Sequence, residues 1–139
     1  MEKNMLVLFG SPRECGFTKE LFDLFIQEWN NIYPDTNIHM FHVYQENMAP
    51  CTACGFCRYK DGCSIPAYRL YRNADVVVVA TPVYGLSFPA PLKAVFDRTQ
   101  QYYEAYVSRH IKHPFEKPKK AFLLSVYGSD DKRGVEMMQ

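Results

Sequence analysis

Short apolar segments alternate with helical patterns along this chain, and this alternation limits the fold more than any other feature. Continuous apolar runs lie at Met5–Phe9, Val76–Ala80 and Ala121–Leu124, the last within a predicted strand Ala121–Val126, and Asn37–Val43 alternates between apolar and polar residues. Continuous apolar runs are typical of strands buried on both faces of a parallel sheet. Helical spacing begins near Thr18 and again near Ala90. Strands that alternate with helices predict an α/β fold, a doubly wound parallel sheet with helices on both faces.

The composition is that of one folded domain spanning residues 1–139. Hydrophobic residues make up 47% of the 139 residues and charged residues 22%, which excludes a disordered chain. The net charge of +1 provides no positive field for binding nucleic acid. No apolar run approaches the length of a bilayer span, and the N-terminus has no signal-peptide pattern. We therefore expect a cytoplasmic protein that acts without a membrane or a nucleic acid.

Three loops follow the carboxyl ends of predicted strands, where open parallel sheets bind their ligands. They are Gly10–Phe17, Thr81–Ser87 and Tyr127–Asp130, and all are rich in small and hydroxyl residues. The first leads into a helix, whose free N–H groups and partial positive charge suit a phosphate. Ser11 and Thr18 offer hydroxyls, Arg13 offers a guanidinium, and Thr18 is also the predicted N-cap. The alternative is an ordinary turn between a strand and a helix, with Arg13 in solvent.

Four of the five cysteines are crowded into one segment with the spacing Cys51-x2-Cys54-x2-Cys57-x5-Cys63. Four thiolates suit a [4Fe–4S] cluster or zinc. The compact run is closer to cluster-binding segments than to zinc sites, which place two cysteine pairs apart in sequence. Thiols without a metal are the third interpretation. Cys15 lies in the first loop, and we interpret it as a small filler residue.

These motifs together resemble one family. The segment 10–18, the cysteine segment, and residues 74–85 with 92–98 are similar to the NADPH-dependent FMN reductase branch of the flavodoxin-like proteins. Within that branch the iron–sulfur flavoproteins are the closest match, and the resemblance extends from about Met5 to Ser129. It implies a parallel sheet of strand order 2-1-3-4. The family normally has a fifth strand followed by a helix, so we expect this chain to be short at its C-terminal end.

The resemblance also implies a set of cofactor-binding residues. The FMN phosphate would be held by Ser11, Arg13, Gly16, Phe17 and Thr18. The isoalloxazine ring would lie against Thr81, Pro82, Val83, Tyr84 and Gly85, and its pyrimidine edge near Tyr127 and Gly128. The cluster ligands would be Cys51, Cys54, Cys57 and Cys63.

Two further positions follow from the same resemblance. Phe17 stands where the family usually has asparagine, and the loss of a side-chain amide predicts weaker FMN binding. Asp97 and Arg98 also match the family, and we interpret them as a structural charge pair at a helix end rather than as catalytic residues.

The resemblance implies an FMN-dependent oxidoreductase with the chemistry on the flavin. It would take electrons from NAD(P)H or a ferredoxin-type carrier and pass them to quinone, flavin or oxygen. An uncovered sheet edge favours association, so we expect a homo-oligomer. The alternatives are a flavodoxin-like electron carrier without turnover, a degenerate flavin-binding module, and a zinc-stabilised interaction domain.

Overall fold

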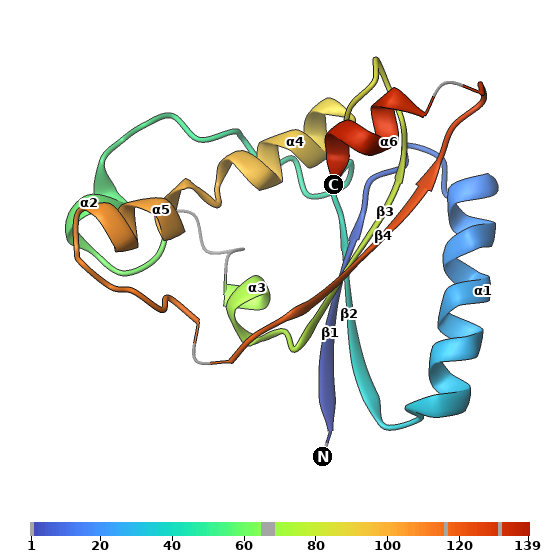
Figure 1. Cartoon of the computed structure of the whole chain (residues 1–139), viewed down its shortest axis with the longest axis horizontal. Helices are drawn as coiled ribbons and strands as arrows, with labels where there is room; N and C mark the ends of the chain where they lie inside the picture. Colours follow the sequence, from blue (N-terminus) through green and yellow to red (C-terminus); the bar gives the residue numbers. More distant parts are fainter. Residues whose placement is uncertain (1, 65–68, 116, 131) are drawn as a thin grey trace.

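The computed structural model describes residues 2–64, 69–115, 117–130 and 132–139. Its centre is a sheet of four parallel strands in the order β2-β1-β3-β4 (Figure 1). The strands are β1 (Lys3–Phe9), β2 (Thr36–His42), β3 (Val76–Pro82) and β4 (Lys120–Val126). The expected α/β fold and strand order are confirmed, and the segments predicted from apolar runs are the strands.

The two central strands explain the apolar runs. Val7 of β1 and Val78 of β3 are fully buried and lie opposite each other in the sheet. Side chains alternate between the two faces of a strand, so continuous burial requires a cover on each face. β-branched valines suit this crowded, pleated position.

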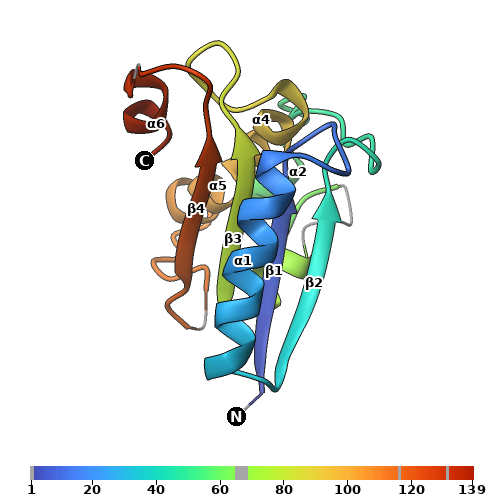
Figure 2. The ribbon, with the colours of Figure 1, turned by 90° about the vertical axis from the view of Figure 1, so that its right-hand side faces the viewer.

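Helix α1 (Phe17–Ile32) covers one face of the sheet (Figure 2). Its Phe22 and Trp29 are buried in a core cluster with Met5, Val7 and Phe9 of β1. Trp29 donates its indole N–H to Oγ1 of Thr36 at 2.9 Å, so its one polar atom is satisfied. The apolar side chains of α1 therefore determine which face of the helix packs on the sheet.

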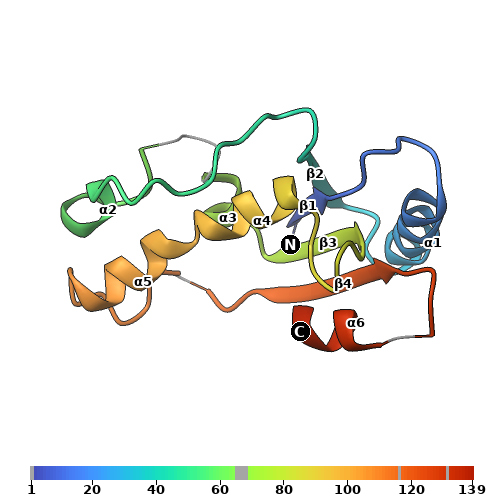
Figure 3. The same ribbon diagram turned by 90° about the horizontal axis from the view of Figure 1, so that it is seen from above.

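The opposite face carries α3 (Arg69–Asn73) and α4 (Ala90–Asp97), with α1 on the far side of the sheet (Figure 3). Leu92 of α4 is fully buried in a second cluster with Leu6, Leu8 and Val77. Burying such a side chain contributes about 1.5–3 kcal/mol. The sheet is thus covered on both faces, as predicted.

Three helices lie away from these two faces. The short α2 (Phe56–Tyr59) and α5 (Gln100–Val107) lie side by side at the end of the molecule farthest from α1 (Figures 1 and 3). The last helix, α6 (Arg133–Met138), packs through Gly134 against the loop after β3. None of the described helices is long and apolar enough to cross a membrane.

The expected N-cap of α1 needs correction. Gly16, not Thr18, is the N-cap of α1, and Thr18 is buried in the first turn, because φ at Gly16 is +152° and glycine tolerates that angle.

Candidate functional site

The three loops expected to bind a ligand meet at one end of the sheet. The N–H of Gly10 donates to the carbonyl of Ala80 at 2.8 Å, which ties the first loop to β3. The N–H of Val83 donates to the carbonyl of Val126 at 2.9 Å, which ties the second loop to β4. A Cβ at Gly10 would lie 2.8 Å from Cδ2 of Leu92 and 3.1 Å from Oγ1 of Thr81, so a larger residue here would force these neighbours or the first loop to shift.

The first loop presents an uncapped helix terminus. No side chain caps α1, so the free N–H groups of its first turn donate no capping hydrogen bond to a side-chain hydroxyl or carboxylate. Ser11 is buried, and its Oγ accepts a hydrogen bond of 3.2 Å from the N–H of Arg13, which curls the loop. Arg13 and Phe17 are exposed beside it. This arrangement of free N–H donors and a guanidinium suits an anion.

The second loop is a tight hairpin. Tyr84 and Ser87 exchange two backbone hydrogen bonds of 3.0 Å, and φ is +56° at Gly85 and +61° at Leu86. Two successive positive φ angles are typical of the type I′ turn, which connects the two arms of a hairpin through two central residues. Thr81 is fully buried and donates its hydroxyl to the carbonyl of Pro82 at 2.8 Å. The loop is thereby a preformed wall, with Tyr84 47% exposed at its tip.

The third loop is open, and the chain end packs behind the second loop. Tyr127 is 39% exposed, and the space around Gly128 is empty. In α6, a Cβ at Gly134 would lie 2.6 Å from Val83 and 3.1 Å from the Leu86 backbone. No local sequence pattern indicates this contact, because it depends on where α6 folds back.

The cysteine segment lies in a different place, on the α2 and α5 side of the molecule (Figures 1 and 3). Cys51, Cys54, Cys57 and Cys63 all line one cavity of about 450 Å³, whose far wall comes from the end of α4 and from α5. All four are free thiols, and Cys51 and Cys54 are exposed. Cys15, in the first loop, is exposed and outside this cavity.

The donor set fits an iron–sulfur group in kind and number. Among the described residues, which include all four thiols, no three metal-ligating side chains lie close enough to hold a metal ion as they stand. Ligation therefore requires the segment to draw its sulfur atoms together. The segment changes direction at Ala53, Gly55 and Gly62, where φ is +53°, +78° and +89°.

Cys54 and Cys57 differ in the pKa of their thiols. A hydrogen bond from the Phe56 backbone, helped by the Ser64 side chain, lowers the pKa of Cys54. Burial raises the pKa of Cys57, and the nearby Glu104 carboxylate adds to the effect. Cys54 is thus the readier thiolate of this pair.

Arg98 is a site residue that the sequence interpretation misjudged. It is not paired with Asp97, which instead makes an i,i+4 ion pair with Lys93. Arg98 is 8% exposed and points into the cysteine cavity, where one guanidinium N–H lies 3.4 Å from Sγ of Cys63. The adjacent charges in the sequence suggested an ion pair. In the structure the Arg98 side chain is instead buried against the cysteine cavity.

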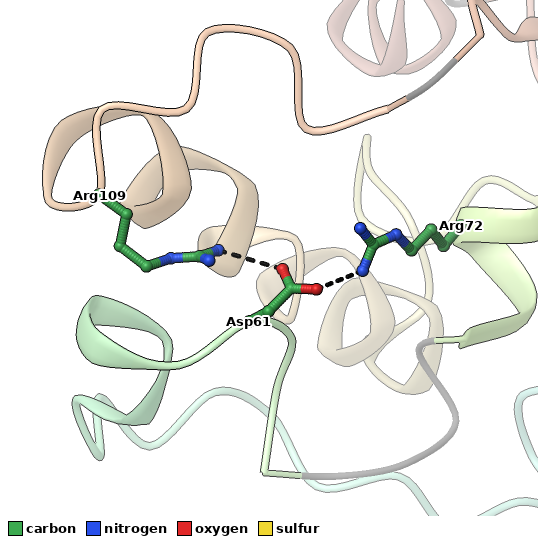
Figure 4. Close-up of polar contacts among 3 residues, drawn as sticks. All are labelled: Asp61, Arg72 and Arg109. Atoms are coloured by element: carbon green, nitrogen blue, oxygen red, sulfur yellow. Dashed lines mark hydrogen bonds and ion pairs between the residues drawn. The ribbon is translucent and has the colours of Figure 1, made fainter.

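An ion-pair cluster fastens the same segment to the rest of the molecule (Figure 4). Asp61, two residues before Cys63, contacts Arg72 of α3 and lies 3.4 Å from the guanidinium of Arg109, which follows α5. Hydrogen bonding from Arg72 lowers the pKa of Asp61. Arginines from two other parts of the chain thus converge on the Asp61 carboxylate and join it to α3 and to the end of α5.

The arrangement agrees with comparisons to known proteins. A model of the flavodoxin-like fold family matches residues 3–138, nearly the whole chain. The chain belongs to the flavodoxin-like family. This family member is 47% identical over 62 residues to an iron-sulfur flavoprotein of Methanosarcina thermophila, an alignment that covers 41% of this chain and 32% of the relative. The expected branch of the family is thereby confirmed.

Two further relatives widen the comparison. The chain is 30% identical over 95 residues to "FMN-dependent NADH:quinone oxidoreductase 2" of Clostridium acetobutylicum, covering 63% of this chain and 48% of the relative. The structure superposes on "NAD(P)H:quinone oxidoreductase from Methanothermobacter marburgensis" with a TM-score of 0.72 and 19% identity, covering 99% of this chain and 73% of the other. That likeness shows the shared fold. The chain spans between about a third and half of the length of the curated relatives it matches.

Proposed function

We propose that this flavodoxin-like protein is an FMN-dependent oxidoreductase that takes electrons from NAD(P)H or a small electron carrier. The observation that carries the proposal is the meeting of three loops at one end of the sheet, beside the uncapped N-terminus of α1. The names of the relatives, an iron-sulfur flavoprotein and an FMN-dependent NADH:quinone oxidoreductase, support it. When bound, FMN would supply the electron transfer itself.

The residues of the chain would bind and orient the cofactor. First-turn N–H groups of α1, with Arg13 and the Thr18 hydroxyl, would hold the phosphate. The stiff hairpin at Tyr84–Ser87 would provide a wall for the ring, with the third loop at its edge. No acid or base is required of a side chain, and we assign none.

The second part of the proposal concerns the cysteine segment. Cys51, Cys54, Cys57 and Cys63 would hold a [4Fe–4S] cluster, which would supply one-electron transfer toward the flavin. The support is that all four thiols line one cavity and that two of the relatives, from Methanosarcina thermophila and Archaeoglobus fulgidus, are iron-sulfur flavoproteins. Zinc at the same thiols and thiols without a metal are the competing outcomes.

The test begins with anaerobically purified protein, on which flavin absorbance, iron and zinc are measured together. The expected sample contains flavin and iron, and it oxidises NADH or NADPH over many turnovers with quinone as acceptor. Flavin bound without turnover would favour an electron carrier. Zinc without flavin, or refusal of added FMN, would contradict the proposal.

A matched pair of variants tests the phosphate position. Arg13→Gln removes one charge-assisted contact and is expected to weaken FMN binding about tenfold. Lys60→Gln makes the same charge change at an exposed residue of the cysteine segment and is expected to leave FMN affinity unchanged. Equal FMN affinity in both variants would remove Arg13 from the site.

We also propose that copies of this chain associate. The outer side of β4 has no strand partner among the described residues, and its apolar side chains are only partly buried. A monomer by light scattering would contradict this.

A further inference from the structure

Arg98 is buried where the cysteine segment begins and ends. It follows the last turn of α4 and is 8% exposed. Its Nε–H donates to the carbonyl of Ala49 at 2.8 Å, two residues before Cys51. Another N–H of the same guanidinium lies 3.4 Å from Sγ of Cys63. One side chain therefore contacts the chain next to the first of the four thiols and also contacts the last of them.

The charge of Arg98 is not balanced by a carboxylate. Among the described residues no acidic side chain lies within ion-pair distance of it. Asp97 is paired with Lys93, and Glu104, on the same cavity wall, is paired with Arg58 at 3.6 Å. A buried cation without an opposite charge is costly. The cavity that Arg98 lines is therefore suited to an anionic group.

Gln101 adds a second polar group to the same wall. It lies one turn beyond Arg98, is 3% exposed and lines the cysteine cavity. Its amide oxygen finds no partner among the described residues. Buried amides normally have hydrogen-bond partners; an amide oxygen accepts and does not donate, so this atom calls for a hydrogen-bond donor, and the suitability of the cavity for an anion comes from Arg98 alone.

We propose that Arg98 is the positioning residue of the cysteine site, which holds the two ends of the segment together and stabilises the negative charge of an iron–sulfur group bound there. This inference rests on the cluster assigned under the proposed function. A cluster with four thiolate ligands is anionic, and its negative charge increases when it accepts an electron. Charge and hydrogen bonds at the sulfurs set the potential of such clusters, so Arg98 favours both retention and reduction of the group.

The experiment compares four proteins that are reconstituted anaerobically with iron and sulfide: wild type, Arg98→Met, Arg98→Lys and Lys93→Met. The measurements are iron per chain, the rate of iron loss to a chelator, and the midpoint potential from a titration followed by electron paramagnetic resonance. Lys93→Met is the matched control, because it removes a positive charge from the exposed side of α4, the helix that Arg98 follows.

Arg98→Met is expected to lose iron to the chelator about tenfold faster than wild type and to have a lower potential. Arg98→Lys keeps the charge but not the two-pronged contact. It is expected to keep a potential near that of wild type and to lose iron at an intermediate rate. Lys93→Met is expected to behave as wild type.

The inference is overturned if Arg98→Met keeps the iron-loss rate and potential of wild type. Should Arg98→Met fail to fold by circular dichroism, Arg98→Lys decides: iron loss at the wild-type rate overturns the inference. Wild-type protein that binds FMN but no iron overturns the cluster assignment and this inference with it. That result differs from a failure confined to the Arg98 variants, in which the cluster assignment stands.

Discussion

Replacing Gly10 with alanine tests how closely the first two loops are packed. The added Cβ would lie 2.8 Å from Cδ2 of Leu92 and 3.1 Å from Oγ1 of Thr81. Both neighbours are fully buried, and Leu92 is held in the cluster on the α4 face of the sheet. Carbon atoms pack best at about 3.5–4.0 Å, so the neighbours or the loop must shift. The φ angle of Gly10 is not in the left-handed region, so the effect comes from contact and not from backbone strain.

The expected cost follows from these contacts. Inserting a methyl into a packed core costs about 1–3 kcal/mol. The loss of glycine freedom in the unfolded chain returns about 0.4–1 kcal/mol. The difference of these ranges extends from about zero to about 2.6 kcal/mol. Because the added Cβ meets two fully buried neighbours at 2.8 and 3.1 Å, we expect a net destabilisation of about 1–2 kcal/mol, which lowers Tm by about 2–8 °C for a domain of this size.

Urea unfolding of both proteins without cofactor measures the difference directly, with the slope m checked for constancy. Gly128→Ala is the control, because no atom lies within 4 Å of its added Cβ. We expect the control to stay within about 0.5 kcal/mol of wild type or to gain slightly. If Gly10→Ala is as stable as Gly128→Ala, the two loops are not in the tight contact described, and the reasoning is refuted.

Two further predictions concern charge and cofactor binding. Asp61→Asn is expected to lower the free energy of unfolding by about 0.5–1 kcal/mol at pH 7, a small value because Asp61 is half exposed. The pKa of Asp61 is held below its ordinary 3.8, so this stabilisation is present above about pH 4 and is lost as the pH falls further. Urea unfolding at several pH values measures the difference, and a difference that persists at pH 2 would contradict the assignment. Phe17→Asn is expected to strengthen FMN binding about fivefold through one added amide hydrogen bond, measured by fluorescence titration; unchanged affinity would mean that position 17 does not face the cofactor.

Much of the architecture could be predicted from local pattern. The apolar runs at Met5–Phe9 and Val76–Ala80 identified central strands, because only a strand covered on both faces buries every residue. Loop position followed from strand order, since the carboxyl ends of parallel strands meet at the same edge of the sheet. The N-cap was harder to predict, because both Gly16 and Thr18 are reasonable caps and only backbone angles distinguish them.

The role of Arg98 shows what sequence could not supply. Its neighbour Asp97 suggested a charge pair, yet adjacent helical residues point in different directions. The pairing of Asp61 with Arg72 and Arg109 joins residues 11 and 48 positions apart, and no local pattern announces it.

The sequence alone determined the α/β class, the strand order through its family resemblance, and the chemical type of each candidate ligand. The fold class and the ligand chemistry depend on composition, period and spacing, which are local properties of the chain, whereas the strand order was implied by the family resemblance. Only the tertiary structure decided that a side chain at Gly10 would crowd Leu92 and Thr81, that α6 packs behind the second loop, and that a buried Arg98 lies beside the cysteines. These depend on contacts between distant segments, and their geometry is set by how the helices pack on the sheet.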